Sequence, residues 1–191
     1  MQSRATALSS TWVRPVGAMG RREFLLLSLL VCLVLLGRAG YDRLSAEELW
    51  PLLEPTAAVI GAFTNAPYLS DPLTGIAFPG LGIVLDRSCA GGHFLLLLTA
   101  LSLWWMRRTL RADARSIAIV ALVFVGSYLL TIASNTMRVC CSLIAIKVDP
   151  TGWVAGTDSM HQLIGIAIQL FLLILCHGFI IRFSFPSTLR A

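Results

Sequence analysis

Long apolar runs alternate with short polar segments along this chain, and arginines stand at the borders of most runs. An α-helix needs about 20 mostly apolar residues to cross the hydrocarbon core of a bilayer. Four runs meet or approach that length, at residues 24–37, 91–106, 116–133 and 162–181. The pattern predicts an all-α membrane protein. We expect a polytopic helical bundle of about four full spans, with a short re-entrant or interfacial helix and a small extracytoplasmic hairpin or loop region.

The first run, residues 24–37, is short for a membrane span. Arg21 and Arg22 precede it and Arg38 follows it, and arginines at both ends can snorkel to the surface and extend the span. A basic start followed by a short apolar core also fits a cleaved signal peptide. No small-x-small cleavage site follows, so we favour a retained anchor. Both interpretations place residue 40 onward outside the cell membrane.

The segment between the first two spans has turn signals instead of a long apolar run. Its local signals are, in order, a capping box at Ser45-Ala46-Glu47-Glu48, an apolar run at 55–63, a turn at 71–75 and a hairpin over 76–86. The capping box opens a short helix, which Pro51 is expected to disturb. The apolar run is too short to cross, so we expect it at the interface. The hairpin delivers Cys89 to the membrane surface.

A polar stretch, Ser134-Asn135-Thr136-Met137-Arg138, ends the third span in this prediction. Residues 139–146 are apolar but too few to cross a bilayer. Counting them as a fifth span would also reverse the last helix and put its arginines outside. We therefore expect residues 139–146 to be re-entrant or interfacial.

Composition narrows the class of protein and orients it. The chain is 57% hydrophobic and 13% charged with a mean hydropathy of +0.79, which excludes an ordinary soluble domain. Its net charge of +5 comes from arginines beside apolar runs, so topology explains it better than nucleic-acid binding does. Ten of the fifteen basic residues are cytoplasmic if both termini are: Arg4, Arg14, Arg21, Arg22, Arg107, Arg108, Arg111, Arg115, Arg182 and Arg190.

The chain then divides simply. We expect residues 1–20 to be a disordered N-terminal segment, residues 21–185 a single multi-pass membrane domain, and residues 186–191 a cytoplasmic tail.

This topology brings three chemically capable residues to one membrane face. Cys89 begins the second span, Arg138 follows the third, and His161 begins the last. A cysteine thiolate is a strong nucleophile that needs a positive neighbour or a base. Arg138 would stabilise the thiolate or an oxyanion, and His161 would carry protons to and from the leaving group. We expect the three side chains to face one cavity and to perform acyl transfer.

Each of these residues also has a structural explanation. Cys89 alone is more often structural, Arg138 fits an interfacial snorkel, and His161 fits a helix cap with Asp158 three residues before it. His93 lies four residues after Cys89 on the same helix face and competes as the base. Because it is one turn into the apolar span, a partner or substrate contact fits His93 better than the role of base, and a membrane histidine with satisfied hydrogen bonds fits better still. We expect it deeper than Cys89 and farther from Arg138.

The other cysteines suggest no further chemistry. No Cys-x-x-Cys or His-x-x-x-His spacing occurs, so the sequence predicts no metal and no cofactor. Cys32, Cys140 and Cys176 lie in apolar runs and behave as small hydrophobes. A thiol redox pair at Cys140 and Cys141 would bridge adjacent residues only with strain, and we rank it last.

Three short motifs together resemble the exosortase/archaeosortase family, and exosortase K most closely. They are Cys89-Ala90-Gly91 at the outer start of a helix, Asn135-Thr136-Met137-Arg138 after a later helix, and Asp158-Ser159-Met160-His161 opening the next. The resemblance covers roughly residues 21–185. The family pattern more often reads Cys-Ser-Gly, so Ala90 departs from it and removes a hydroxyl beside the thiol.

The resemblance implies a multi-pass enzyme of the bacterial inner membrane whose active site faces the extracytoplasmic side. Such enzymes resemble sortases in their catalytic residues. They recognise a C-terminal sorting signal, made of a Pro-Glu-Pro-like motif, a membrane helix and a basic cluster. They cleave this signal and pass the protein to another anchor. The expected partners are tails of exported proteins, the bilayer, and a lipid or glycan acceptor, but no nucleic acid.

Carried onto this chain, the resemblance makes Cys89 the nucleophile, Arg138 the electrostatic stabiliser and His161 the acid and base. The residues expected to support them or to bind substrate are Asn135, Gly91, Arg87, His93 and Asp158. The alternative is a non-catalytic multi-pass membrane subunit for export or for polysaccharide or envelope assembly.

Overall fold

The computed structural model describes residues 20–106, 114–148 and 157–184, and gives the backbone alone at residues 22, 157–161 and 180–184. The elements of these ranges are α1 (Arg21–Tyr41), α2 (Trp50–Thr64), β1 (Leu69–Asp71), β2 (Gly75–Phe78), β3 (Ile83–Leu85), the 3₁₀ turn η2 (Arg87–Cys89), α3 (Gly92–Met106), α4 (Ala114–Val148) and α5 (Thr157–Ser184). Residues 1–19, 107–113, 149–156 and 185–191 lie outside the described residues, so the predictions for the N-terminal segment 1–20, apart from Gly20, and for the tail 186–191 lie outside them too.

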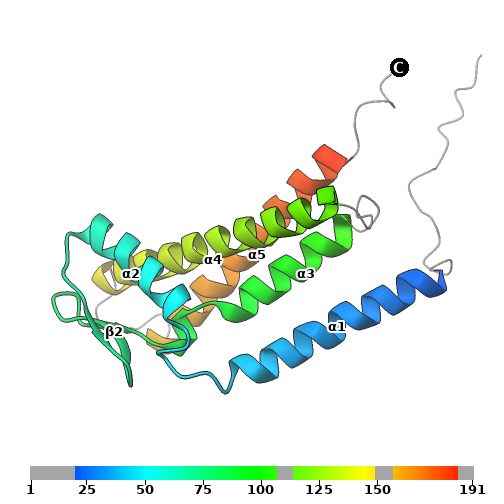
Figure 1. Ribbon diagram of the computed structural model, residues 1–191. Helices are drawn as coiled ribbons and strands as arrows, with labels where there is room; N and C mark the ends of the chain where they lie inside the picture. Colours follow the sequence, from blue (N-terminus) through cyan, green and yellow to red (C-terminus); the bar gives the residue numbers. More distant parts are fainter. Residues whose placement is uncertain (1–19, 107–113, 149–156, 185–191) are drawn as a thin grey trace, which may run out of the picture.

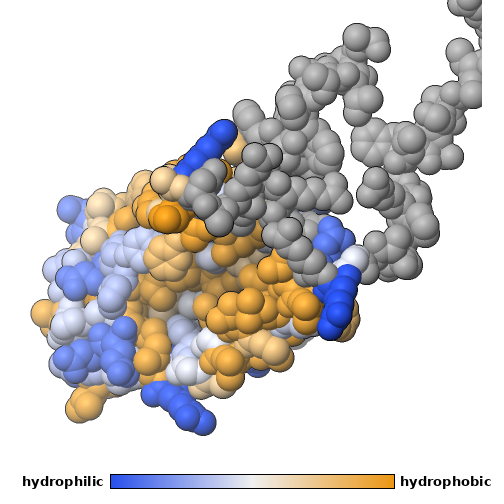
Figure 2. Space-filling view, turned by 45° about the vertical axis from the view of Figure 1, so that its right-hand side comes forward, coloured by the Kyte–Doolittle hydropathy of each residue, from blue (hydrophilic) through white to orange (hydrophobic). Residues whose placement is uncertain are grey.

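The described part is an all-α polytopic membrane protein with a small sheet. Four of its helices are long and apolar enough to cross a membrane: α1, α3 with the turn before it, α4 and α5. Many large apolar side chains on these helices point outward, such as Leu36, Ile117 and Leu122, each at least 71% exposed. Hydrophobic residues cover most of the helical part of the face in Figure 2, whereas hydrophilic residues gather at the end that carries the sheet. Such a surface is stable in lipid and not in water.

The helices α3, α4 and α5 pack on one another, α1 packs mainly on α3, and α2 packs on α4 (Figure 1). At one end of this bundle, α1 and α4 finish, α3 and α5 begin, and the sheet is attached. We call it the sheet end. Every motif singled out from the sequence belongs to an element that begins or ends there.

The sheet confirms the predicted hairpin and adds a strand. β2 and β3 pair antiparallel, with Phe78 opposite Ile83, and β1 pairs with the other edge of β2. The turn before β2 is also confirmed, because the Asp71 carboxylate accepts hydrogen bonds from the Leu73 amide and the Thr74 hydroxyl. Gly75 has φ +108°, and a Cβ there would lie 2.2 Å from a backbone oxygen of β3, so only glycine fits.

The sheet and α2 share a small apolar core beside α4. Its fully buried side chains are Leu53, Ile60, Ile76, Phe78 and Leu85. The sequence analysis expected a short helix followed by a separate apolar run. In the structure both belong to one helix, α2, which begins at Trp50. Pro51 lies in its first turn, where a missing N–H costs no helical hydrogen bond, so it does not disturb the helix. The capping box of Ser45 and Glu48 forms, but it closes the turn before this helix.

The polar stretch before Arg138 does not end a helix, which corrects the sequence analysis. α4 runs unbroken for 35 residues through it, and residues 139–146 are the last turns of α4 and not a re-entrant segment. Ser134, Asn135 and Thr136 are buried against neighbouring elements. Each costs at most about 0.7 kcal/mol of helix propensity, and no proline or glycine follows Gly126 in this helix.

Candidate functional site

Cys89 is the last residue of η2, the turn that joins β3 to α3. The Asp86 carboxylate builds this turn, since it accepts from the Ser88 amide at 2.9 Å and from the Ser88 hydroxyl at 2.6 Å. The Cys89 amide then donates to the Asp86 carbonyl. An aspartate that caps its own turn is a local sequence signal. The residues around Cys89 therefore shape the turn that carries it. The cysteine itself is 6% exposed.

Gly91 lets Asn135 of α4 lie directly against the backbone that follows Cys89. Gly91 has φ +70°, and a Cβ there would lie 2.5 Å from Asn135 Nδ2 and 2.6 Å from its Oδ1. Asn135 is 1% exposed, and neither amide atom has a hydrogen-bond partner in the described ranges. A buried amide without partners is rare in folded proteins, and it is available to a polar ligand.

Arg138 lies one helical turn after Asn135 and also reaches the Cys89 turn. Its Nη2 donates to the carbonyl oxygen of Ser88 at 2.9 Å. On its other side, its Cδ lies 2.7 Å from the place of a Cβ on Gly165 of α5. α4 therefore presents Asn135 and Arg138 on one face to the turn, as residues three apart do, and glycines on both neighbours make room for them.

His161 and Asp158 belong to the first turns of α5, where the structure gives the backbone alone. His161 precedes Gly165 by four residues and so lies on the same face of α5, one turn nearer its start. Since Gly165 packs on Arg138, the backbone of His161 belongs to the same end and the same side of the bundle as the Cys89 turn. Contact between the His161 side chain and the other two residues remains a prediction.

The sequence analysis expected Cys89 and Arg138 to line one cavity. The structure places them on two neighbouring cavities instead. Cys89 lines a cavity of about 260 Å³ between β3 and α4, with Val139 and Ser142 in its far wall. Arg138 lines a more polar cavity of about 440 Å³. Ser88 belongs to both. The turn separates them, since its Ser88 carbonyl faces Arg138 while Cys89 lies toward the far wall.

His93 also differs from its expected place. It is the second residue of α3, its side chain is half exposed, and it lines the same cavity as Arg138. Its Nε2 lies 3.4 Å from Oδ1 of Asp42, and its ring packs on Tyr41 with centroids 4.6 Å apart. His93 was placed one turn into the apolar span, but α3 begins only at Gly92, so His93 lies in its first turn. That it lies deeper than Cys89 and farther from Arg138 stays a prediction.

Sequence reasoning missed the end of α1 as part of the site. The Tyr41 hydroxyl donates to the Arg87 carbonyl at 2.9 Å, and Arg87 Nη1 donates to the Asp42 carbonyl at 2.7 Å. Gly92 leaves room for the Tyr41 ring, which a Cβ would overlap. The signal was present as a tyrosine and an aspartate directly after the first span. Only the fold shows that both form hydrogen bonds with Arg87 in the Cys89 turn.

No protein-family model, curated protein or solved structure matches the chain. No three or more His, Cys, Asp or Glu side chains gather as metal ligands within the described ranges. The geometry that carries chemistry is thus a buried thiol on a turn that α4 holds through Arg138. An unpartnered asparagine amide lies beside this turn, and a His–Asp pair lies on its far side.

Proposed function

We propose that this protein is a membrane-embedded cysteine peptidase or transpeptidase of the exosortase type. It processes C-terminal sorting signals of exported proteins at the outer face of the bacterial inner membrane. One observation supports this most: Arg138 donates to the carbonyl that immediately precedes Cys89, although 50 residues separate donor and acceptor. Two of the three motifs behind the family resemblance therefore meet in space, and the backbone of the third lies on the adjoining helix.

In the proposed reaction the Cys89 thiolate attacks the scissile carbonyl, and a carbon–sulfur bond forms. The carbon–nitrogen bond then breaks, and the leaving amine takes a proton from His161. Water, or a hydroxyl or amine of a lipid or glycan acceptor, resolves the thioester and releases the thiolate. The scissile peptide enters the 260 Å³ cavity, because Cys89 lines it.

Arg138 has two roles in this proposal. A guanidinium has five N–H donors in a rigid fork, and one of them already holds the Ser88 carbonyl. That bond fixes the turn that carries the nucleophile. Arg138 lines the neighbouring cavity, so its remaining donors stabilise the oxyanion that forms on attack only when the scissile carbonyl extends past the Ser88 turn. The buried amide of Asn135 has no hydrogen-bond partner among the described residues, so it is a further donor and acceptor beside the same turn.

The orientation rests on the arginine distribution. Ten of the fifteen basic residues are cytoplasmic if the sheet end faces outward, which the positive-inside rule favours. The active site then lies at the outer end of the spans. Exported proteins arrive on that side, with their tails still in the bilayer.

A non-catalytic subunit for export or envelope assembly is the second candidate. The observation that favours it is the separation of Cys89 and Arg138 onto two cavities. In that case the bonds from Tyr41, Arg87 and Arg138 serve only to clasp the turn.

Cys89 variants separate the two candidates. The assay is a gel shift of a tagged exported protein with a motif, membrane helix and basic tail, co-expressed with each variant at matched abundance. We expect Cys89→Ala and Cys89→Ser to abolish processing, because an alkoxide is far harder to form than a thiolate. Cys141→Ala is the matched control and should process normally. Full processing by Cys89→Ala would refute the enzyme proposal.

His161→Ala tests the acid. Leaving-group protonation fails while attack persists, so the reaction stalls before the carbon–nitrogen bond breaks, and we expect slowed or lost processing with no hydroxylamine-sensitive thioester on Cys89. Normal turnover by His161→Ala would remove His161 from the mechanism.

A further inference from the structure

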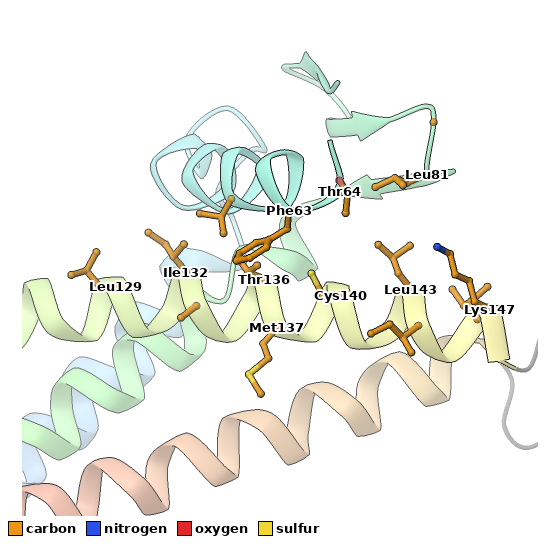
Figure 3. Close-up of a pocket in the computed structure, with 15 residues that line it drawn as sticks. Phe63, Thr64, Leu81, Leu129, Ile132, Thr136, Met137, Cys140, Leu143 and Lys147 are labelled. Atoms are coloured by element: carbon orange, nitrogen blue, oxygen red, sulfur yellow. The ribbon is translucent and has the colours of Figure 1, made fainter. Parts of the chain in front are cut away.

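A long apolar groove runs along the side of α4 that faces α2, apart from the polar cavity of Arg138. Its walls are α4, the end of α2 with Val59, Phe63 and Thr64, and the tip of the hairpin with Gly80 and Leu81. Its volume is about 1020 Å³. Figure 3 shows it from the side, with α2 and the hairpin on one side of α4 and α5 on the other. We call it the α2/α4 groove.

One stripe of side chains forms the floor of this groove. Its members recur every three or four positions and so share one face of α4: Leu129, Ile132, Thr136, Cys140, Leu143 and Lys147. All but the last are apolar or small. Lys147 is the only lysine in the chain, and it closes the groove at the sheet end with its amine on the groove side of α4 (Figure 3). The groove is therefore apolar along its length and cationic at one end.

We infer that the α2/α4 groove binds an anionic glycerophospholipid, with its acyl chains along α4 toward Leu129 and its phosphate at Lys147. Charge complementarity at one end and apolar walls elsewhere match an amphiphile with an anionic head. The groove is also unsuited to water. Phe63 is 78% exposed and Ile144 is 62% exposed, and both line it.

The lining of the groove suits acyl chains. From Leu129 to Lys147 the floor is about 27 Å long at the rise of an α-helix. Apolar side chains line that length, and acyl chains bury their methylene groups against such a surface.

The length of α4 puts Lys147 at the depth of lipid headgroups. Its 35 residues are about 52 Å long. A tilt of roughly 20–40° shortens the span along the membrane normal to about 40–49 Å. A bilayer with its headgroup layers is about 40–45 Å thick. α4 thus reaches from one headgroup layer to the other, and Lys147 lies next to its last residue.

The headgroup end of the groove adjoins the cavity of Cys89. Leu143 and Ile146 line both. A lipid in the groove therefore has its polar end beside the cavity that contains the thiol. The binding inference does not depend on the proposed activity, because its test uses no protein substrate.

The test is photocrosslinking of the purified full chain in nanodiscs. The probe is phosphatidylglycerol with a diazirine in one acyl chain, and phosphatidylcholine with the same chains is the comparison. We expect labelled peptides from α4 and α2, with at least threefold more label from phosphatidylglycerol. Lys147→Glu should abolish that preference and Lys147→Arg should keep it. Equal labelling by both lipids in the wild-type protein would overturn the inference.

A second variant tests the groove itself. Ala133 lines the groove and is exposed, so Ala133→Trp should fill it and lower the α4 label at least fivefold. Ala121 is exposed on α4 outside the groove, so Ala121→Trp is the matched control and should leave the label unchanged. Unchanged labelling of Ala133→Trp would contradict the proposed place. Displacement of the lipid label by an apolar membrane-spanning peptide would show a helix as the occupant and overturn lipid binding.

Discussion

Replacing Gly91 with alanine tests whether Asn135 lies against the Cys89 turn. The change has two separable costs. Gly91 adopts the left-handed backbone conformation at φ +70°. This conformation costs any residue other than glycine about 1–2 kcal/mol. The new Cβ would also lie 2.5 Å from Asn135 Nδ2, and overpacking of this kind costs about 1–3 kcal/mol. We expect Gly91→Ala to lower the free energy of unfolding by about 2–5 kcal/mol in total.

A double-mutant cycle separates the two costs. Asn135→Ala removes the amide that the new Cβ would meet, so in that background only the backbone cost of about 1–2 kcal/mol should remain. The coupling between the two sites is then about 1–3 kcal/mol. Asn135→Ala alone should cost little, because no described group hydrogen-bonds the buried amide and its removal relieves a desolvation penalty.

The measurement is unfolding of the purified protein by SDS in mixed micelles, followed by circular dichroism. Gly126→Ala is the control. Gly126 lies inside α4 with nothing within 4 Å of an added Cβ, so alanine should be neutral or should gain up to about 1 kcal/mol. An equal cost of Gly91→Ala with and without Asn135 would show that the amide does not lie over the turn. The arrangement of the candidate site would then be wrong.

Three further predictions follow from the site and the topology. In a cysteine-free background, a cysteine at position 70 should react with an impermeant maleimide in intact cells, and one at position 112 should react only after permeabilisation; the reverse would put the Cys89 turn in the cytoplasm. Arg138→Lys should lose at least about tenfold in processing rate, since lysine keeps the charge but not the planar guanidinium that donates to Ser88. A wild-type rate in this variant would show that only the positive charge of Arg138 matters. The Thr74 hydroxyl and the Leu73 amide lower the pKa of Asp71, so the turn is most stable above the ordinary pKa of an aspartate and loosens as pH falls through the lowered value. Asp71→Asn should abolish this pH dependence in hydrogen exchange of β1 and β2, and an unchanged profile would contradict it.

The sequence predicted the local features of the fold well. Apolar length predicts the spans, because a bilayer imposes it. The hairpin follows from the pattern between Gly75 and Asp86, because pairing and turn chemistry are local there. β1 was missed because three residues, Leu69–Asp71, carry too little periodicity to identify a strand.

The sequence predicted where Cys89 and Arg138 lie in the fold but not what they contact. Topology was enough to bring Cys89 and Arg138 to the same end of the bundle. The two cavities and the clasp from Tyr41 depend on side-chain direction and on glycines that admit neighbours at close range. Those are tertiary facts, and no spacing in the sequence encodes them.

The break wrongly expected in α4 and the candidate site have the same cause. The stretch from Ser134 to Arg138 was interpreted as a break because polar residues are costly in a membrane. Its polar side chains are in fact turned inward, where Ser134 and Asn135 are 1% exposed. The amide of Asn135 is buried without a hydrogen-bond partner among the described residues, and a buried polar group of this kind lowers stability unless it has another use. Asn135 and Arg138 of this stretch are also the residues that contact the Cys89 turn. Local inconsistency of this kind is expected at functional sites, so the misassigned segment is itself an argument that α4 carries function and not only a span.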